Sequence, residues 1–164
     1  MTAQIMDTVV YRDLTWSLCK VDWENWNIPS NEELGFECET ESTANYSGRV
    51  DYICIDRQNR LKLEKIRVNL TRKYKDFVPE NGFREELKTI YSHPTEKTRE
   101  EVFLNYYNLP IKYTGEMILG RQFNRDKYVH MGIQSAESFY HRIYLKLKKV
   151  KVLAEHTKEE KGEV

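Results

Sequence analysis

The sequence predicts a mainly β (α+β) fold, in which a single domain of antiparallel sheet and hairpins carries one or two short helices. Two observations favour strands: hydrophobic and polar residues alternate in several segments, and aromatic residues make up 12% of the chain. The third observation is size, because 164 residues that are 40% hydrophobic suit one well-formed core rather than two. We expect residues 1–156 to form the domain and the charged residues 157–164 to form a flexible tail.

The first pair of predicted strands covers residues 46–55 and 61–70, joined by the polar residues 56–60. In the second strand Leu61 and Leu63 alternate with polar residues, which is the period-two pattern of a half-buried strand. The short polar connection predicts that the two strands form a hairpin.

The clearest predicted strand covers residues 139–148, where side chains alternate between two faces. One face carries Phe139, His141, Ile143, Leu145 and Leu147, and the other carries Tyr140, Arg142, Tyr144, Lys146 and Lys148. Val150 and Val152 are expected to extend the alternation.

Residues 81–91 are predicted to form a short amphipathic helix, because Phe83, Leu87 and Ile90 recur at helical spacing before the break at Pro94. Residues 98–108 fit a second short helix, although their apolar residues agree with both periods.

Residues 111–123 predict a further strand, interrupted by Gly115 and Gly120. These segments complete a chain in which no linker or internal repeat divides the domain.

The opening residues carry Asp7 and Asp13 and never develop the apolar stretch of a secretory leader. We therefore expect the mature chain to begin near Met1 and to be cytoplasmic, with no membrane association. The odd number of cysteines, Cys19, Cys38 and Cys54, and their lack of C-x-x-C spacing predict reduced thiols.

Charge is balanced overall and uneven along the chain. The 26 basic and 26 acidic residues cancel, which argues against a dedicated nucleic-acid binder. Residues 22–41 nevertheless carry a net charge of −7, and residues 57–75 carry +7. The two stretches either neutralise each other or serve partners. A third interpretation, RNA binding, would use Arg67, Arg72, Lys73, Tyr74 and Lys75.

The acidic stretch also contains two tryptophans. Tryptophan burial supplies affinity and complementary charge speeds encounter, so the combination suits a basic protein partner. We therefore predict a non-catalytic protein-binding module, an immunity- or antitoxin-like protein that masks a basic partner such as a toxin. The predicted contact residues are Asp22, Trp23, Glu24, Trp26, Glu32, Glu33 and Glu37. The alternative interpretation is that both tryptophans cover the sheet.

The sequence lacks the familiar catalytic motifs G-x-S-x-G, G-x-x-x-x-G-K-[ST], G-x-G-x-x-G and H-E-x-x-H, which favours a protein that is not an enzyme. The rival hypothesis is a small-ligand site or unrecognised enzyme at His130 and His141, with Glu137, Tyr113 and Tyr128. A hairpin turning about residues 134–136 would place the two histidines opposite each other. No third ligand stands at a recognised spacing, so we expect neither metal nor cofactor.

Residues 113–120 read YTGEMILG and residues 128–132 read YVHMG. These runs resemble an uncharacterised family of small bacterial β-rich proteins, whose members carry a YTGG-apolar strand and a YVHMGYGSxYE hairpin. Upstream, Gly48, Ile55, Leu61, Leu63 and Ile66 resemble that family's strand pair, so the similarity covers residues 46–149.

Two positions depart from the family pattern. Ile133-Gln134-Ser135 replaces Tyr-Gly-Ser after the motif's glycine, and the family's strand tryptophan falls at Ile53. The resemblance implies a β-rich fold in a bacterial, intracellular setting, and the family brings no established activity.

Overall fold

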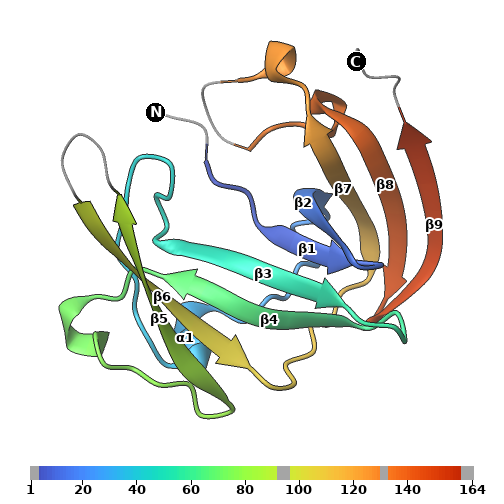
Figure 1. Ribbon diagram of the computed structural model, residues 1–164. Helices are drawn as coiled ribbons and strands as arrows, with labels where there is room; N and C mark the ends of the chain where they lie inside the picture. The colour runs from blue at the N-terminus through green and yellow to red at the C-terminus, as the bar shows by residue number, and fades with distance from the viewer. Residues whose placement is uncertain (1–3, 92–96, 130–132, 160–164) are drawn as a thin grey trace.

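Nine strands, within residues 4–91, 97–129 and 133–159 that the computed structural model describes, form one sheet in the order β5-β6-β4-β3-β1-β2-β7-β8-β9 (Figure 1). Neighbouring strands are antiparallel except β1 and β3, which are parallel. The strands are β1 (Thr8–Tyr11), β2 (Leu14–Val21), β3 (Arg49–Ile55), β4 (Leu61–Val68), β5 (Gly82–Tyr91), β6 (Lys97–Tyr106), β7 (Gly115–Phe123), β8 (Phe139–Lys148) and β9 (Lys151–Glu159). The predicted mainly β fold is confirmed.

In the part of the chain that the structure describes, helical structure is confined to short pieces. They are the four-residue helix α1 (Asn31–Leu34) and the 3-10 turns η1 (Arg72–Tyr74), η2 (Arg125–Lys127) and η3 (Ala136–Ser138). Within the described residues, no helix is long and apolar enough to span a membrane.

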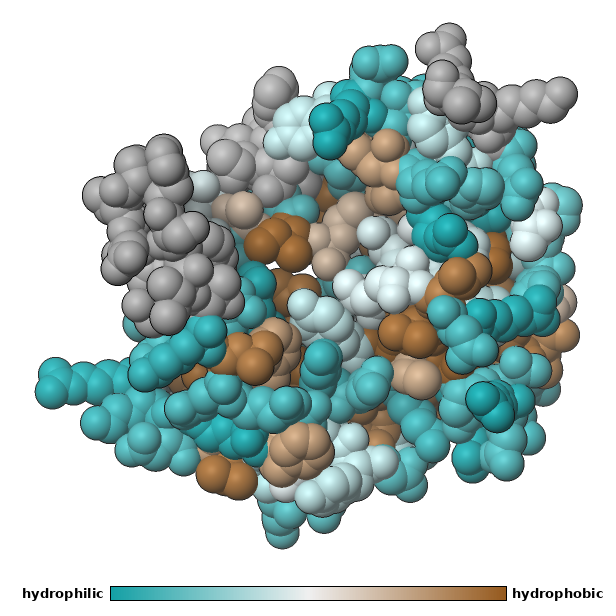
Figure 2. All heavy atoms as spheres, in the orientation of Figure 1, coloured by the Kyte–Doolittle hydropathy of each residue, from teal (hydrophilic) through white to brown (hydrophobic). Residues whose placement is uncertain are grey.

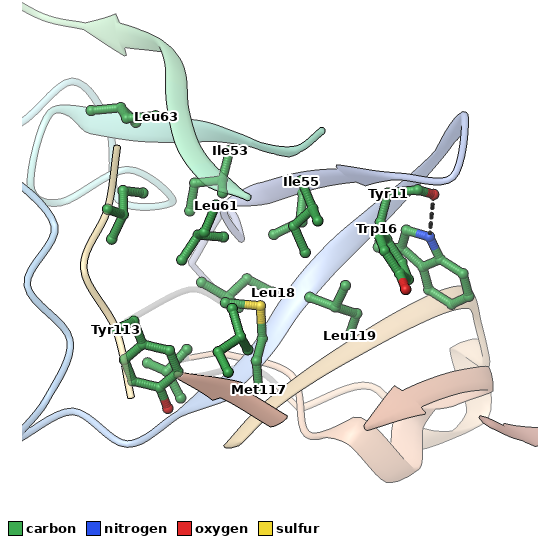
Figure 3. Close-up of a cluster of buried hydrophobic side chains, with 14 of the residues drawn as sticks. Tyr11, Trp16, Leu18, Ile53, Ile55, Leu61, Leu63, Tyr113, Met117 and Leu119 are labelled. Carbon is green, nitrogen blue, oxygen red and sulfur yellow. Dashed lines mark hydrogen bonds between the residues drawn. The ribbon is translucent and has the colours of Figure 1, made fainter. Parts of the chain in front are cut away.

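The sheet curls, so that β3 and β4 lie across the core from β7 and β8 (Figure 1). The turn between β3 and β4 meets the turn between β8 and β9, because Leu61 N donates to Val150 O at 2.7 Å and Val152 N donates to Asn59 O at 2.9 Å. The curled sheet encloses buried side chains from most strands, including Leu18, Ile53, Leu61, Met117 and Leu119 (Figure 3). Their burial closes the fold around one core, as the composition predicted.

The predicted hairpin of residues 46–70 is present as β3 and β4, and the strand predicted at 139–148 is β8. The predicted extension through Val150 is wrong. Lys149 adopts a positive φ of 59°, the chain turns back, and β9 pairs antiparallel with β8. Strand β9 continues to Glu159, three residues into the segment predicted as a tail.

The two predicted helices are wrong. Residues 82–91 form β5, which pairs along its whole length with β6. A spacing of four residues puts Phe83 and Leu87 on the same face of a strand as well as of a helix, so it did not discriminate between them. In β6, Phe103, Leu104 and Asn105 are all buried, which removes the alternation that identifies a strand.

Candidate functional site

Trp23 stands on a tight turn that follows β2. The turn is built by Asp22, whose carboxylate accepts hydrogen bonds from Glu24 N at 3.3 Å and from Asn25 Nδ2 at 2.7 Å. Asp22 N also donates to Tyr113 Oη at 2.7 Å, which ties the turn to the segment before β7. The turn leaves the Trp23 side chain 58% exposed.

The second predicted tryptophan has a different environment. The ring of Trp26 packs edge-on against Tyr113, with centroids 5.2 Å apart and planes at 81°. Tyr113 itself is 1% exposed and belongs to the core. Trp26 therefore covers the core, as the alternative interpretation held, whereas Trp23 faces solvent.

Trp23 lies between two hollows. The first, which we call the acidic hollow, has a volume of about 590 Å³ and is lined by Lys20, Val21, Asp22, Trp23, Glu24, Gly115, Glu116 and Ile118. Three of its lining residues are exposed acids, so it offers an electronegative setting beside a large aromatic ring.

The second, which we call the apolar hollow, has a volume of about 490 Å³. It is lined by Gln4, Ile5, Asp7, Leu18, Trp23, Asn45, Tyr46, Ser47, Arg49 and Ile133. On the face shown in Figure 2, hydrophobic residues are exposed among hydrophilic ones near the segment that leads into β1.

Two charged residues that line the apolar hollow, Asp7 and Arg49, contact the buried Asp51. Arg49 Nε contacts Asp51 Oδ1 at 2.6 Å, Arg49 Nη1 donates to Asn31 Oδ1 at 2.9 Å, and Asp51 N donates to Asp7 Oδ1 at 2.8 Å. Burial and the neighbouring charge of Asp51 raise the pKa of Asp7 to about 7, and burial raises the pKa of Asp51. The Asp7 carboxyl therefore changes its protonation near neutral pH.

The remaining predicted acids surround α1. Glu33 completes a capping box with Ser30, because Ser30 Oγ accepts from Glu33 N at 3.1 Å and Glu33 Oε1 accepts from Ser30 N at 3.4 Å. Glu32 and Glu37 are exposed and line a further hollow of about 530 Å³. Asn31 of α1 binds Arg49, which connects this group to the apolar hollow.

Among the described residues, one ion pair joins the acidic stretch to the basic stretch. Glu41 lies 3.3 Å from Arg67. Glu24, Glu32 and Glu37 form no ion pair with any residue in the described part of the chain. Their charges thus remain available to a partner.

The strand register around His141 differs from the one that the histidine hypothesis predicted. His141 of β8 lies opposite Arg121 of β7 and Glu159 of β9, and its Nδ1 is 3.3 Å from Glu159 Oε1. The predicted cross-strand pair with His130 is therefore wrong, and His130 itself lies outside the described residues. β7 pairs with β8 across the longer connection of residues 124–138, so the turn about residues 134–136 does not set the register.

The other residues of that hypothesis are dispersed. Tyr113 is buried near the opposite end of β7 from Arg121, the partner of His141. Glu137 is exposed in η3, and Tyr128 packs edge-on against Phe123 at 6.3 Å. In the described ranges, no three His, Cys, Asp or Glu side chains are grouped closely enough to hold a metal ion.

Sequence reasoning missed three polar residues that line the apolar hollow, Asp7, Asn45 and Arg49, and it missed Asp51, which contacts Asp7 and Arg49. One signal was present, because Asp51, Ile53 and Ile55 are two residues apart and therefore share one face of the predicted strand. An acid on the inner face of a strand indicates a buried polar contact.

The fold and these hollows define a single-domain, curved β-sheet protein with a concave surface on either side of one exposed tryptophan. No family model, curated protein or solved structure matches the chain. The resemblance to small bacterial β-rich proteins therefore stays a prediction.

Proposed function

We propose that this chain is a non-catalytic binding protein that holds a basic protein partner on the surface around Trp23. The observation that carries the proposal is the combination of an exposed Trp23 with exposed carboxylates that have no ion pair among the described residues. A tryptophan that becomes buried at an interface is among the strongest single contributors to protein affinity.

Charge supports the same partner chemistry. Glu24 lies in the acidic hollow beside Trp23, and Glu32 and Glu37 flank α1. Such a surface attracts a cationic protein over a Debye length of about 8–10 Å and orients it before contact. The acidic hollow then offers Asp22 and Glu116 to a lysine or arginine next to the tryptophan.

The biological setting is part of the proposal. In the cytoplasm of a bacterial cell, an immunity- or antitoxin-like protein would use this surface to mask a basic toxin. The resemblance to small bacterial proteins supports that setting, and the product of a neighbouring gene is the first partner to test.

Affinity capture with matched variants tests the proposal. We expect Trp23→Ala to weaken binding of the captured basic protein by about 2 kcal/mol, which is roughly 30-fold in Kd. Tyr107→Ala is the control, because Tyr107 follows the last residue of β6, is 72% exposed and lies outside both hollows. Titration calorimetry on the purified pair measures both variants.

A second variant isolates the charges. Replacing Glu24, Glu32 and Glu37 with glutamine should weaken binding most at low ionic strength, whereas the same change at Glu64 and Glu80 should leave it unaltered. Equal recovery of the partner by wild type, Trp23→Ala and the triple glutamine variant contradicts the proposal.

A further inference from the structure

The apolar hollow has features that binding a basic protein does not require. Four large apolar side chains, Ile5, Trp23, Tyr46 and Ile133, meet there with exposed fractions between 44% and 64%. The volume of about 490 Å³ falls within the range of about 300–1,000 Å³ that is typical of small-molecule sites. These walls suit the planar, apolar body of a small ligand.

Two residues that line the same hollow, Asn45 and Arg49, each carry a buried hydrogen-bond donor. Asn45 is 3% exposed, and its Nδ2 has no hydrogen-bond partner among the described residues. Arg49 uses Nε and Nη1 on Asp51 and Asn31, while its Nη2 is buried with no such partner. A buried donor without an acceptor is unfavourable, so both atoms favour a ligand that brings an oxygen.

The charges around these donors define what kind of oxygen fits. The Arg49 guanidinium is already matched by Asp51 at 2.6 Å, and Asp7 accepts from the backbone of Asp51. A carboxylate head would add a third acid to one buried base. An uncharged carbonyl accepts the same hydrogen bonds without that repulsion.

We propose that the apolar hollow binds a small molecule with a planar apolar body and an uncharged carbonyl head, whose oxygen accepts hydrogen bonds from Asn45 Nδ2 and Arg49 Nη2. Both nitrogen atoms are covered, so the head reaches them when a lining side chain moves aside. Tyr46 lines the hollow and is free to move, because its side chain is exposed and forms no hydrogen bond with the described residues.

Three probes of one ring system test the head group: 1-naphthamide, 1-naphthoate and 1-methylnaphthalene. Saturation-transfer NMR titrations on the full chain give their affinities. We expect 1-naphthamide to bind about tenfold more tightly than each of the other two, because only it supplies an uncharged acceptor. Equal affinity of 1-naphthamide and 1-methylnaphthalene, or no saturable binding of any probe, overturns the proposal.

Variants locate the site. Asn45→Asp keeps the side-chain shape and replaces the donor with an acceptor, so it should abolish the preference for 1-naphthamide. Thermal unfolding accompanies this variant, and Arg49→Lys, which removes Nη2 and keeps the charge, provides the same test if Asn45→Asp does not fold. A preference that survives in the folded variant overturns the assignment of the donors.

Further variants test the apolar walls of the hollow. They also test whether small-molecule binding is separate from binding of the basic partner. Ile133→Ser should weaken all probes that bind by about fivefold, whereas Tyr107→Ser should have no effect. The triple glutamine variant at Glu24, Glu32 and Glu37 should keep 1-naphthamide binding while it binds the basic partner more weakly. Probe binding that is unchanged by Ile133→Ser overturns the site, and failure of partner capture alone does not affect it.

Discussion

The basic stretch of residues 57–75 and the acidic stretch of residues 22–41 carry equal and opposite charge, yet the fold uses them differently. Several bases are engaged within the protein: Arg60 and Lys62 contact Asp56 at 3.1 and 3.3 Å, Arg67 contacts Glu41 and Glu101 at 3.3 and 3.6 Å, and Lys65 lies over Tyr52 and Phe103. The acids Glu24, Glu32 and Glu37 have no such partner in the described chain. Sequence charge alone does not reveal which stretch the fold itself neutralises.

The difference follows from secondary structure. Most of the engaged bases lie on β4, where they are reached by residues of the neighbouring strands, such as Glu101 of β6, and by Asp56 of the turn that leads into β4. The acids lie on the long connection between β2 and β3, whose only regular element in the described residues is the four-residue α1. Of the acids on this connection, Glu41 reaches Arg67 of β4, whereas Glu24, Glu32 and Glu37 reach no base among the described residues.

The largest effect should come from the basic side of this comparison. The Arg67 side chain is 11% exposed, and Arg67→Met would leave Glu41 and Glu101 without their shared cation. We expect the free energy of unfolding to fall by about 2–3 kcal/mol, as measured by urea denaturation.

Arg72→Met is the matched control, because Arg72 is exposed on η1 and should change stability by less than about 0.5 kcal/mol. Comparable losses in both variants would mean that the ion pairs of Arg67 contribute no more to stability than the contacts of an exposed base.

The sequence predicted the parts of the fold that have a local signal. The β3–β4 hairpin and β8 follow from alternation of apolar residues, which a half-buried strand requires. The β1–β2 hairpin was missed because its two-residue turn, Arg12-Asp13, has positive φ angles of 52° and 61° where Asn-Gly is the usual signal.

The candidate site divides in the same way. Trp23 and its acidic neighbours are contiguous in sequence, so composition identified them. Asp7 and Asp51 meet only because β1 pairs parallel with β3, and such a long-range pairing has no local sequence signal. Trp26 was assigned to the partner surface because nothing in the sequence distinguishes a solvent-facing tryptophan from one that packs on Tyr113.

A second, smaller effect concerns Asp7, whose side chain is half-buried. The pKa of Asp7 is raised to about 7 in the folded chain, so between about pH 4 and pH 7 the native state holds a proton that the unfolded chain releases. The stabilisation is complete below the unfolded pKa and is lost as pH rises through about 7. We expect a loss on the order of 1–2 kcal/mol from this group, after allowance for its partial exposure.

Asp7→Asn tests this sign. Asparagine still accepts the hydrogen bond from Asp51 N and does not titrate, so the unfolding free energy of the variant should decline less between pH 4 and pH 8. Burial also raises the pKa of Asp51, so the unfolding free energy of the variant should still fall with pH, with a smaller slope. Parallel pH profiles for wild type and variant would contradict the assignment.

The smallest effect on stability should come from the exposed acids. Glu24, Glu32 and Glu37 have no ion pair in the described chain, so their joint replacement with glutamine removes only repulsion between like charges. We expect the unfolding free energy to stay within about 0.5 kcal/mol of wild type or to rise slightly. A loss above about 1 kcal/mol in the same urea titration would show that these charges stabilise the fold after all. If stability is unchanged and partner binding is weakened, the three acids contribute to binding and not to folding.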